Sequence, residues 1–480
     1  MPRLQFRQRA GRFWREYTRM RTAIFFLIGL IALVLIGSFV PQDGTSDPTK
    51  VQQFLSDHGN LESLFAHLGL PLTSVFVSPV FYVLLGSLYI ALAACVLRRG
   101  SALLKRTLRR YPRSPQYWGE WGSWVFHTAF FLLLIAVVWG KATGYQGLVA
   151  VTEGQEFTDS RAGYDTLQEG LLFNGQHAGF TLKLDKFTAT YGANGQASDY
   201  VSNVQVYDGG VLRLQKDVRV NDFLSYDGIN VYQQDYGWAP QLVVKNPAGQ
   251  VVFDAPIQMF GSDKSQQTGV LKVPDFGYTV PGSPPAIQLG ARLAFFPDAR
   301  EINTIGSNGI VDPTATQYGP GGEEARLPVL DVQLWVGDLG VNSGQPQNVN
   351  TLDTDHMQPY FSDAHVLPLQ LGQTLTLPLP AADSKQVPFT VSFTALHQYS
   401  LFQVSKDSGV LLVYTTFGLV MFGLLTKLYL RPLLERRERR RKRRPLQLDR
   451  RWTQQASGEP AEAGAAARDP AAEEREPAGV

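Results

Sequence analysis

One histidine of this 480-residue chain lies inside an apolar run, where an ionisable group has to be explained. The stretch WGSWVFHTAFFLLLIAVVWG, from Trp121 to Gly140, is typical of a membrane-spanning helix except for His127 near its start. Because an ionisable side chain is costly in lipid, His127 needs a hydrogen bond or a ligand. Two interpretations stay open. One is a hydrogen bond to Ser123 or to a neighbouring helix, and the other is axial ligation of haem iron by neutral imidazole.

The rest of the chain limits the chemistry that it can perform. Cys95 is its one cysteine, which excludes an internal disulfide, a CxxC dithiol and covalent attachment of haem to this chain. The other six histidines lie outside the apolar runs, so a second intramembrane haem ligand must come from another subunit or another copy. No G-x-S-x-G, HExxH or phosphate-binding glycine loop is present. We therefore expect no catalytic residue, and a non-catalytic or co-catalytic subunit.

The remaining histidines show no spacing that assigns them a role: His58, His67, His177, His356, His365 and His397. The stretch DTDHMQPYFSDAH contributes Asp353, Asp355, His356, Asp363 and His365 to a possible metal site. This spacing matches no known metal motif, and an acidic surface loop is the plainer interpretation. We expect His58 and His67 to be ordinary residues at the membrane surface.

Four apolar stretches are long enough to span a bilayer, which takes about 20 residues. They are Thr22–Val40, Pro79–Leu97, Gly122–Gly140 and Val410–Leu430. We interpret the first as a retained anchor, because its apolar run is longer than that of a signal peptide and GSFVPQD is a poor cleavage site.

Charge is distributed unevenly along the chain. Residues 141–409 hold 15 Lys and Arg against 27 Asp and Glu, and the other residues hold 29 against 15. Arginines precede the first apolar run (Arg3, Arg7, Arg9, Arg12, Arg15, Arg19 and Arg21), and basic clusters follow the second and fourth runs. The positive-inside rule then predicts cytoplasmic termini and an external segment 141–409. Contact with anionic lipid explains RRERRRKRR better than nucleic-acid binding does.

The expected organisation follows from these segments. Residues 1–21 form a basic cytoplasmic N-terminus. Residues 22–140 form a three-helix membrane region with a short external loop 41–78 and a basic cytoplasmic loop 98–121. Residues 141–409 form an external domain, 410–430 a fourth transmembrane helix, and 431–480 a cytoplasmic tail, basic and then disordered.

The external segment has the two-residue periodicity of β-strands. Alternating stretches such as FTLKLDKFTATY, PVLDVQLWVG and VPFTVSFTAL are separated by turn signals such as DGG. We predict a mainly-β, sandwich-like domain with irregular insertions around 300–360. In the loop after the first span, VQQFLSDHGNLESLFAHLGL predicts one or two short helices on the outer membrane surface, with a break at Gly59.

Four stretches of the chain together resemble a known family. They are GSFVPQD, LGLPLTSVFVSPVFYVLLGSLYIALAACVLRR, DGINVYQQDYGW and LFQVSKDSGVLLVYTTFGLVMFGLL. In this order, and with three spans, a β-rich insert and one span, the chain resembles the ResB/Ccs1 (CcsB) family of System II cytochrome c biogenesis proteins over roughly residues 10–430. Proline usually stands at the position of Ser408 in that family, but Gly409 still supplies a turn into the last span.

The resemblance implies a bacterial inner-membrane protein that works with a CcsA/ResC-type haem-handling partner. Together they would carry haem b across the membrane and present it with apocytochrome c for covalent attachment. His127 stands where the family has a histidine proposed to ligate the haem iron with a histidine of the partner. The tryptophan-rich haem loop belongs to the partner, so we interpret Trp118 and Trp121 of WGEWGSW as anchors at the membrane surface.

Two other functions stay open. One is a structural membrane scaffold whose β domain binds protein or envelope polymer, and the other is an electron-transfer cytochrome subunit. In the favoured interpretation the external domain docks the partner and positions apocytochrome c, and its acidic charge attracts basic apocytochromes.

Overall fold

The computed structural model describes residues 14, 16–43, 48–110, 113–192, 197–261, 263–280, 283–305, 311–341, 350–361, 366–380 and 385–441. Outside these ranges lie residues 1–13, which include Arg3, Arg7, Arg9 and Arg12. Arg15, Asp363, His365 and the expected disordered tail also lie outside them. The chain forms two compact units, one from the segments up to Val137 and after Val410, and one from Val138–Gly409.

Four helices among the described residues are long and apolar enough to cross a membrane. They are α2 (Met20–Phe39), α4 (Pro79–Leu108), α5 (Pro115–Thr143) and α6 (Val410–Leu425), which continues through the π-helical turn η4 (Thr426–Leu430). Between the first two lie α3 (Pro48–His67) and the 3-10 helix η1 (Leu72–Val77). The prediction of three N-terminal helices and one C-terminal helix is confirmed.

The backbone shows where α3 breaks, and the local sequence explains where α4 begins. Ser78 caps α4 by accepting a hydrogen bond from the amide of Phe81 at 3.2 Å, and Pro79 occupies the first turn, where a missing N–H costs nothing. α3 is two helical segments joined at His58, whose φ of −129° and ψ of 19° are not helical. The predicted pair of short helices is therefore confirmed, with its break one residue before Gly59.

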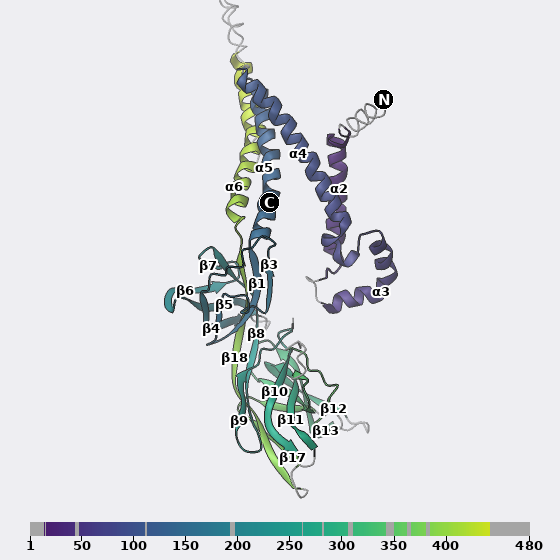
Figure 1. Cartoon of the computed structure of the whole chain (residues 1–480), viewed down its shortest axis with the longest axis vertical. Helices are drawn as coiled ribbons and strands as arrows, with labels where there is room; N and C mark the ends of the chain where they lie inside the picture. Colours follow the sequence, from purple (N-terminus) through teal and green to yellow (C-terminus); the bar gives the residue numbers. More distant parts are fainter. Residues whose placement is uncertain are drawn as a thin grey trace, which may run out of the picture. The chain divides into compact units, whose positions relative to one another are not determined.

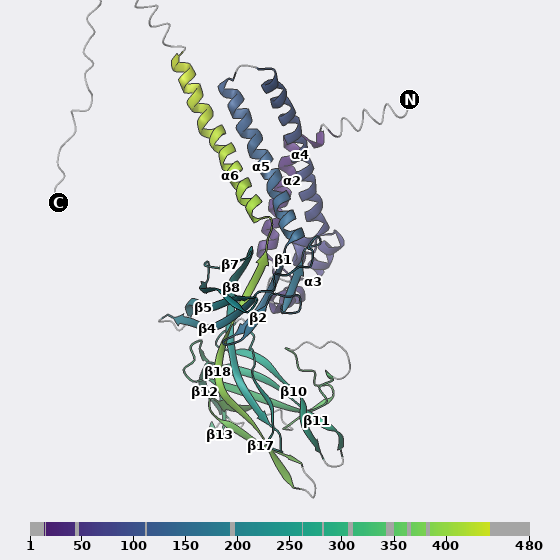
Figure 2. The same ribbon diagram turned by 60° about the vertical axis from the view of Figure 1, so that its left-hand side comes forward.

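Glycines let the membrane helices approach closely. α6 lies beside α5, and α4 lies beside α2 (Figures 1 and 2). A Cβ on Gly423 would lie 2.8 Å from the carbonyl oxygen of Gly122, and a Cβ on Gly100 would lie 2.6 Å from the indole nitrogen of Trp124. Small residues at such crossings allow the backbone contact that drives helix association in lipid.

The second unit is built of strands. They are β1 (Tyr145–Thr152), β2 (Glu156–Thr158), β3 (Thr166–Glu169), β4 (Thr181–Tyr191), β5 (Ala197–Asp208), β6 (Val211–Arg219), β7 (Leu224–Tyr226), β8 (Ile229–Lys245), β9 (Val251–Pro256), β10 (Gln267–Val280), β11 (Ser283–Phe296), β12 (Asp298–Ile305), β13 (Val311–Gly322), β14 (Val329–Gly337), β15 (Met357–Pro359), β16 (Leu367–Gln370), β17 (Thr374–Pro380) and β18 (Gln386–Lys406).

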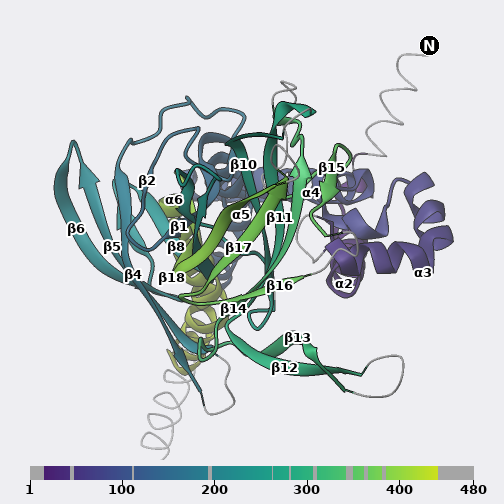
Figure 3. The same ribbon diagram turned by 90° about the horizontal axis from the view of Figure 1, so that it is seen from below.

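The strands form four sheets around one long pair. β8 and β18 pair antiparallel from Ile229–Lys406 to Lys245–Thr390. They lie in a seven-stranded sheet, β3-β1-β18-β8-β7, in which β17 also pairs with β18 and β9 with β8. The other sheets are β2-β4-β5-β6, β10-β11-β14-β15 with β16 on β14, and the hairpin β12-β13. Figures 1 and 2 show β4 and β5 toward one end of the long pair and β10–β13 toward the other, and Figure 3, seen from below, shows β4–β6 and β12–β13 on opposite sides.

The long pair contributes to two hydrophobic cores. One end, with Tyr236 and Phe402, packs against the four-stranded sheet, and the other end, with Trp238 and Phe393, packs against the five-stranded sheet. Five successive residues of β8, from 236 to 240, are buried where the strand passes from one core to the other. The prediction of a mainly-β domain is confirmed. Its two hydrophobic cores share the strands β8 and β18.

Two further sequence predictions meet the structure in this unit. The Asp-Gly turn before β8 is present, with positive φ at Asp227 (48°) and Gly228 (72°), as a tight hairpin turn requires. In the expected irregular region around 300–360, the hairpin β12-β13 has register shifts at Asp298–Ala299 and at Asn303–Ile305. Residues 306–310 and 342–349 lie outside the described ranges, and β14 is the strand that PVLDVQLWVG predicted. β14 pairs with β11 on one side and with β15 and β16 on the other, and its residues alternate between buried and half-buried from Leu330 to Trp335, as in a strand with one face on the core.

Candidate functional site

A cavity of about 520 Å³ opens between α2, α4 and α5, and His127 lies on its wall. Its size is within the usual range for sites that bind organic cofactors. The residues that line it are Thr18, Arg19, Met20, Ala23, Ile24, Leu27, Leu88, Tyr89, Ala91, Leu92, Cys95, Arg98, Arg99, His127 and Phe130. Most of the wall is apolar, and the charged groups are three arginines.

The imidazole of His127 has one nitrogen engaged. Its Nδ1 lies 2.6 Å from the backbone carbonyl oxygen of Ser123, so the predicted hydrogen bond to Ser123 is confirmed. A carbonyl oxygen only accepts, so Nδ1 must carry the proton and donate. No hydrogen-bond partner is recorded for Nε2 within the described residues. This is the arrangement in which a histidine offers Nε2 to a metal while a second contact fixes its ring.

Contacts between α4 and α5 place the imidazole relative to the arginines. The guanidinium of Arg99 donates to Ser123 Oγ at 3.2 Å, and Tyr89 Oη donates to the carbonyl oxygen of Phe130 at 2.7 Å. Because the two helices are antiparallel here, these contacts place His127 between the levels of Leu92 and Cys95. Arg98 and Arg99 then lie about three to seven residues, roughly 5–10 Å, further along α4.

The arginines give the cavity a basic end. Arg98 donates to Thr18 Oγ1 at 2.6 Å and Arg99 to Ser123 Oγ, so these hydrogen bonds join each guanidinium to a neutral group. Arg19 pairs with the exposed carboxylate of Glu16 at 2.6 Å. No carboxylate is among the described residues that line the cavity. The basic end therefore suits the carboxylates of a ligand.

The donor set fits haem. Haem is a flat apolar macrocycle with iron at its centre and two carboxylates at one edge. The cavity offers an imidazole nitrogen for iron, apolar side chains for the ring, and arginines displaced along the helix for the carboxylates. It offers one imidazole, so a second histidine ligand would have to come from another chain.

A second histidine, in the β unit, is fully engaged. His177 lies with Nδ1 3.2 Å from Asp159 Oδ1 and Nε2 3.2 Å from Glu169 Oε1, and its side chain is 7% exposed. The buried Asp159 also accepts hydrogen bonds from the hydroxyls of Tyr145 and Tyr164 at 2.9 and 2.5 Å. Burial and the adjacent Asp159 raise the pKa of both tyrosines well above the ordinary value. This cluster ties β1 to the loops on either side of β3.

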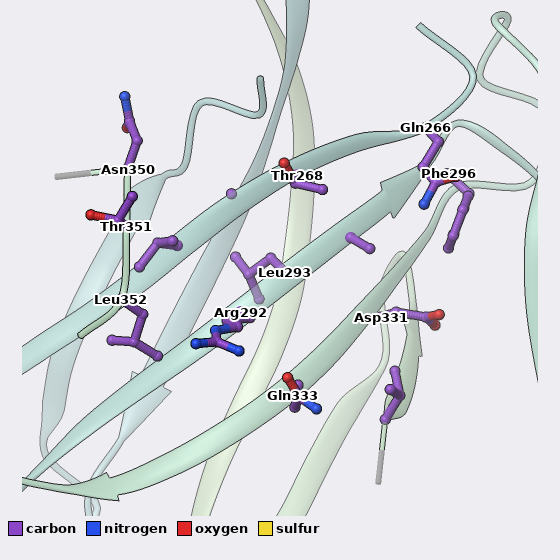
Figure 4. Close-up of a pocket in the computed structure, with 14 residues that line it drawn as sticks. Gln266, Thr268, Arg292, Leu293, Phe296, Asp331, Gln333, Asn350, Thr351 and Leu352 are labelled. Carbon is purple, nitrogen blue, oxygen red and sulfur yellow. The ribbon is translucent and has the colours of Figure 1, made fainter. Parts of the chain in front are cut away.

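A cavity of the β unit lies on the face of β10, β11 and β14 that points away from the hydrophobic core (Figure 4). It measures about 660 Å³, and Arg292, Asp331 and Gln333 point into it from neighbouring strands. The Arg292 guanidinium stacks 5.3 Å from the ring of Trp335. Burial raises the pKa of the Asp331 carboxyl to about 6. The cavity is polar and open, and it contains no histidine among its lining residues.

The structure brings none of the other predicted histidines into a site. His58 and His356 are exposed, His67 bonds the carbonyl of Ser63 within α3, and His397 Nε2 lies 3.2 Å from Gln241 Oε1. The described residues contain no group of three His, Cys, Asp or Glu side chains arranged to hold a metal ion. Of the loop 353–365, the parts up to 361 are described, and Asp363 and His365 are not.

The two tryptophans expected at the membrane surface, Trp118 and Trp121, differ in how exposed their side chains are. Trp118 is 36% exposed. The indole of Trp121 stacks edge-on against Trp124 at 5.2 Å, and its N–H is buried without a recorded partner in the described residues. Trp121 therefore packs against its neighbours on α5, and the interpretation of both tryptophans as interfacial anchors stays a prediction.

Sequence reasoning missed the rest of the cavity wall. In the sequence, membrane orientation alone explains Arg98 and Arg99. Tyr89 and Cys95 belong there to the second apolar stretch. A helical stripe of Leu88, Leu92, Cys95 and Arg99, three or four residues apart, marks one face of α4 and contained the signal.

Comparison with known proteins matches nearly the whole described chain. The model of the ResB-like family matches residues 20–117 and 116–438. A relative named "Cytochrome c biogenesis protein CCS1, chloroplastic", from Chlamydomonas reinhardtii, is 22% identical over 85% of this chain and 70% of its own length.

Two cyanobacterial relatives are each named "Cytochrome c biogenesis protein CcsB". The protein from Synechococcus sp. is 22% identical over 45% of this chain and 55% of its own length. The protein from Crocosphaera subtropica is 28% identical over 30% of this chain and 31% of its own length, so these matches span about half and a third of those relatives. With four potential membrane-spanning helices and a family match over both units, this chain is a membrane protein that belongs to the ResB-like family.

Proposed function

We propose that this chain takes part in cytochrome c maturation, as a subunit that binds haem within the membrane. In this proposal it belongs to a System II complex, helps to carry haem across the membrane, and presents it with apocytochrome c for covalent attachment. The family match and the names of the relatives support the process. The cavity with one available imidazole nitrogen and three arginines supports the binding of haem, and it is the observation that carries the proposal.

Each side chain of the cavity has a defined task in this proposal. His127 ligates iron through Nε2, while the Ser123 carbonyl holds the ring in the tautomer that ligation requires. Arg98 and Arg99 bind the two carboxylates of haem, and Leu88, Leu92 and Ile24 cover the ring. A histidine of a CcsA/ResC-type partner supplies the second axial ligand.

The arginines also suggest the direction of entry. The basic ends of the helices face the cytoplasm under the positive-inside rule, which places the β unit on the external side of the bacterial inner membrane. Haem would then enter with its carboxylates toward the cytoplasm. On the other side, the β unit would dock the partner and apocytochrome c, whose CxxCH thiols perform the bond formation. The chain supplies no nucleophile to that reaction.

The experiment is to purify the chain together with its partner and to record the haem absorbance band. His127→Ala should remove at least about nine-tenths of the bound haem, because a lost axial bond is worth well over 1.4 kcal/mol. His356→Ala, at an exposed histidine of the β unit, is the matched control and should leave the band unchanged.

Retention of the band in His127→Ala with normal cytochrome c maturation would refute the ligand assignment and leave the scaffold interpretation. Stable haem that is reduced by quinol, with normal cytochrome c assembly after deletion of the gene, would assign the chain to electron transfer.

A further inference from the structure

A second cavity, which shares Arg99 with the one that contains His127, opens where the basic ends of α4, α5 and α6 meet. It measures about 430 Å³ and is lined by Arg99, Ala102, Leu103, Arg106, Gly119, Glu120, Ser123, Lys427 and Arg431. Four of these side chains are basic and one is acidic. The helices of one chain therefore build a basic cavity with room for an anionic group.

The two bases from the C-terminal helix reach this cavity because of local backbone geometry. Lys427 lies in the π-helical turn η4, and Arg431 follows it directly. The turn packs on α5 at its glycines. A Cβ on Gly122 would lie 2.9 Å from the amide nitrogen of Lys427, and a Cβ on Gly119 would lie 2.5 Å from Arg431 Cδ. Single π-helical turns are rare and concentrate at functional sites.

The carboxylates of the region neutralise two of the four bases. Arg106 pairs with Glu120 at 2.6 Å, and Arg431 pairs with Glu435 at 2.9 Å. Arg99 donates to the neutral hydroxyl of Ser123, and no ion pair of Lys427 is recorded in the described residues. Two like charges that share a cavity beside lipid repel each other, and a bound anion removes that repulsion.

The height of the cavity identifies the anion. Arg99, Ser123 and Lys427 lie where the apolar runs of α4, α5 and η4 begin or end, which is the level of lipid headgroups. Arginine and lysine are the usual ligands of phosphate, and basic cavities between membrane helices bind anionic headgroups. We infer that this cavity binds the phosphate of an anionic phospholipid, with Lys427 as its principal ligand and Arg431 beside it as a second donor.

The inference is tested with the full-length chain extracted from membranes and analysed for co-purified lipid by native mass spectrometry. The wild type should retain anionic phosphatidylglycerol or cardiolipin in preference to phosphatidylcholine. Lys427→Gln combined with Arg431→Gln should lower this retention about tenfold, as expected for the loss of charge-assisted hydrogen bonds. Arg436→Gln combined with Arg437→Gln removes the same charge from exposed positions of the same helix and should have no such effect.

Two further arms make the result specific. Lys427→Arg with Arg431→Lys keeps both charges and should restore retention, which separates binding from misfolding. Inorganic phosphate should not displace the lipid or raise the melting temperature at concentrations where anionic lipid does.

Equal retention of anionic lipid by the Lys427→Gln/Arg431→Gln and Arg436→Gln/Arg437→Gln variants would overturn the inference. So would wild-type protein that retains phosphatidylcholine as well as it retains anionic lipid. Stabilisation by inorganic phosphate alone would assign the site to a soluble anion and would overturn the lipid assignment. Lys427 and Arg431 do not line the cavity that contains His127, so these outcomes are independent of haem binding.

Discussion

His127 of the helical unit and His177 of the β unit differ in the number of ring nitrogens that are engaged. His127 has Nδ1 bound to a carbonyl oxygen of its own helix, and Nε2 has no recorded partner. His177 has a carboxylate against each nitrogen. An imidazole with both nitrogens engaged ties a fold together, whereas an imidazole with one nitrogen available can bind a ligand. The difference favours a structural role for His177 and supports the ligand role that we propose for His127.

The largest expected effect concerns the structural histidine. Asp159→Ala should lower the free energy of unfolding of the β unit by about 3–5 kcal/mol, because it leaves His177 and two tyrosine hydroxyls buried without their common acceptor. Thermal unfolding of the full-length chain, followed by near-ultraviolet circular dichroism, measures this. Asp353→Ala, in an exposed loop, is the control. An unchanged transition in Asp159→Ala would show that the cluster is not a structural tie.

The second effect concerns the basic end of the cavity with His127. Arg98→Gln combined with Arg99→Gln should weaken haem retention about tenfold or more while leaving the axial absorbance signature intact, because carboxylate contacts are lost and the iron ligand is kept. Haem transfer to an acceptor such as apomyoglobin measures the change in release rate. Arg436→Gln with Arg437→Gln is the charge-matched control. If both pairs released haem at the wild-type rate, the cavity would not hold the carboxylates.

The smallest effect sharpens the contrast between two carboxylates of the β unit. Asp159 has several donors, whereas burial alone raises the pKa of Asp331 to about 6. Since the folded state holds this proton more tightly than the unfolded state, Asp331 loses its favourable contribution to stability as the pH rises from about 4 through 6. Asp331→Asn should therefore stabilise the β unit by about 1 kcal/mol at pH 7.5, after allowance for solvent screening, and by almost nothing at pH 4.

Urea unfolding of the variant and the wild type at the two pH values provides the measurement. A stabilisation of equal size at both would contradict the raised pKa. Destabilisation at pH 7.5 would show that the ionised carboxylate has a partner in the fold.

The sequence predicted those features that depend on local pattern. Apolar runs of about 20 residues located the four membrane helices, two-residue alternation located strands such as β14, and the Asp-Gly pair located the turn before β8. His127 stood out because an ionisable residue interrupts an apolar run. Each of these signals lies within a window of a few turns or a few strand residues.

Features that depend on contacts between distant residues could not be predicted. Asp159, Glu169 and His177 meet only because β1–β3 fold back on each other, and no motif spacing marks them. The passage of β8 from one core to the next is a property of its partners and not of its own periodicity. The orientation rule alone explains Arg98 and Arg99. Their second role, as part of a cavity wall, was marked only by the helical stripe of Leu88, Leu92, Cys95 and Arg99.

Chemical rescue tests the assignment of His127 most directly. The complex with the partner is prepared with His127→Gly, and the haem spectrum is recorded before and after addition of imidazole. The account predicts loss of the low-spin band and its return with imidazole, because the substitution leaves room for an exogenous ligand at the position of Nε2. A wild-type band in His127→Gly without imidazole, in a complex that still matures cytochrome c, would contradict it.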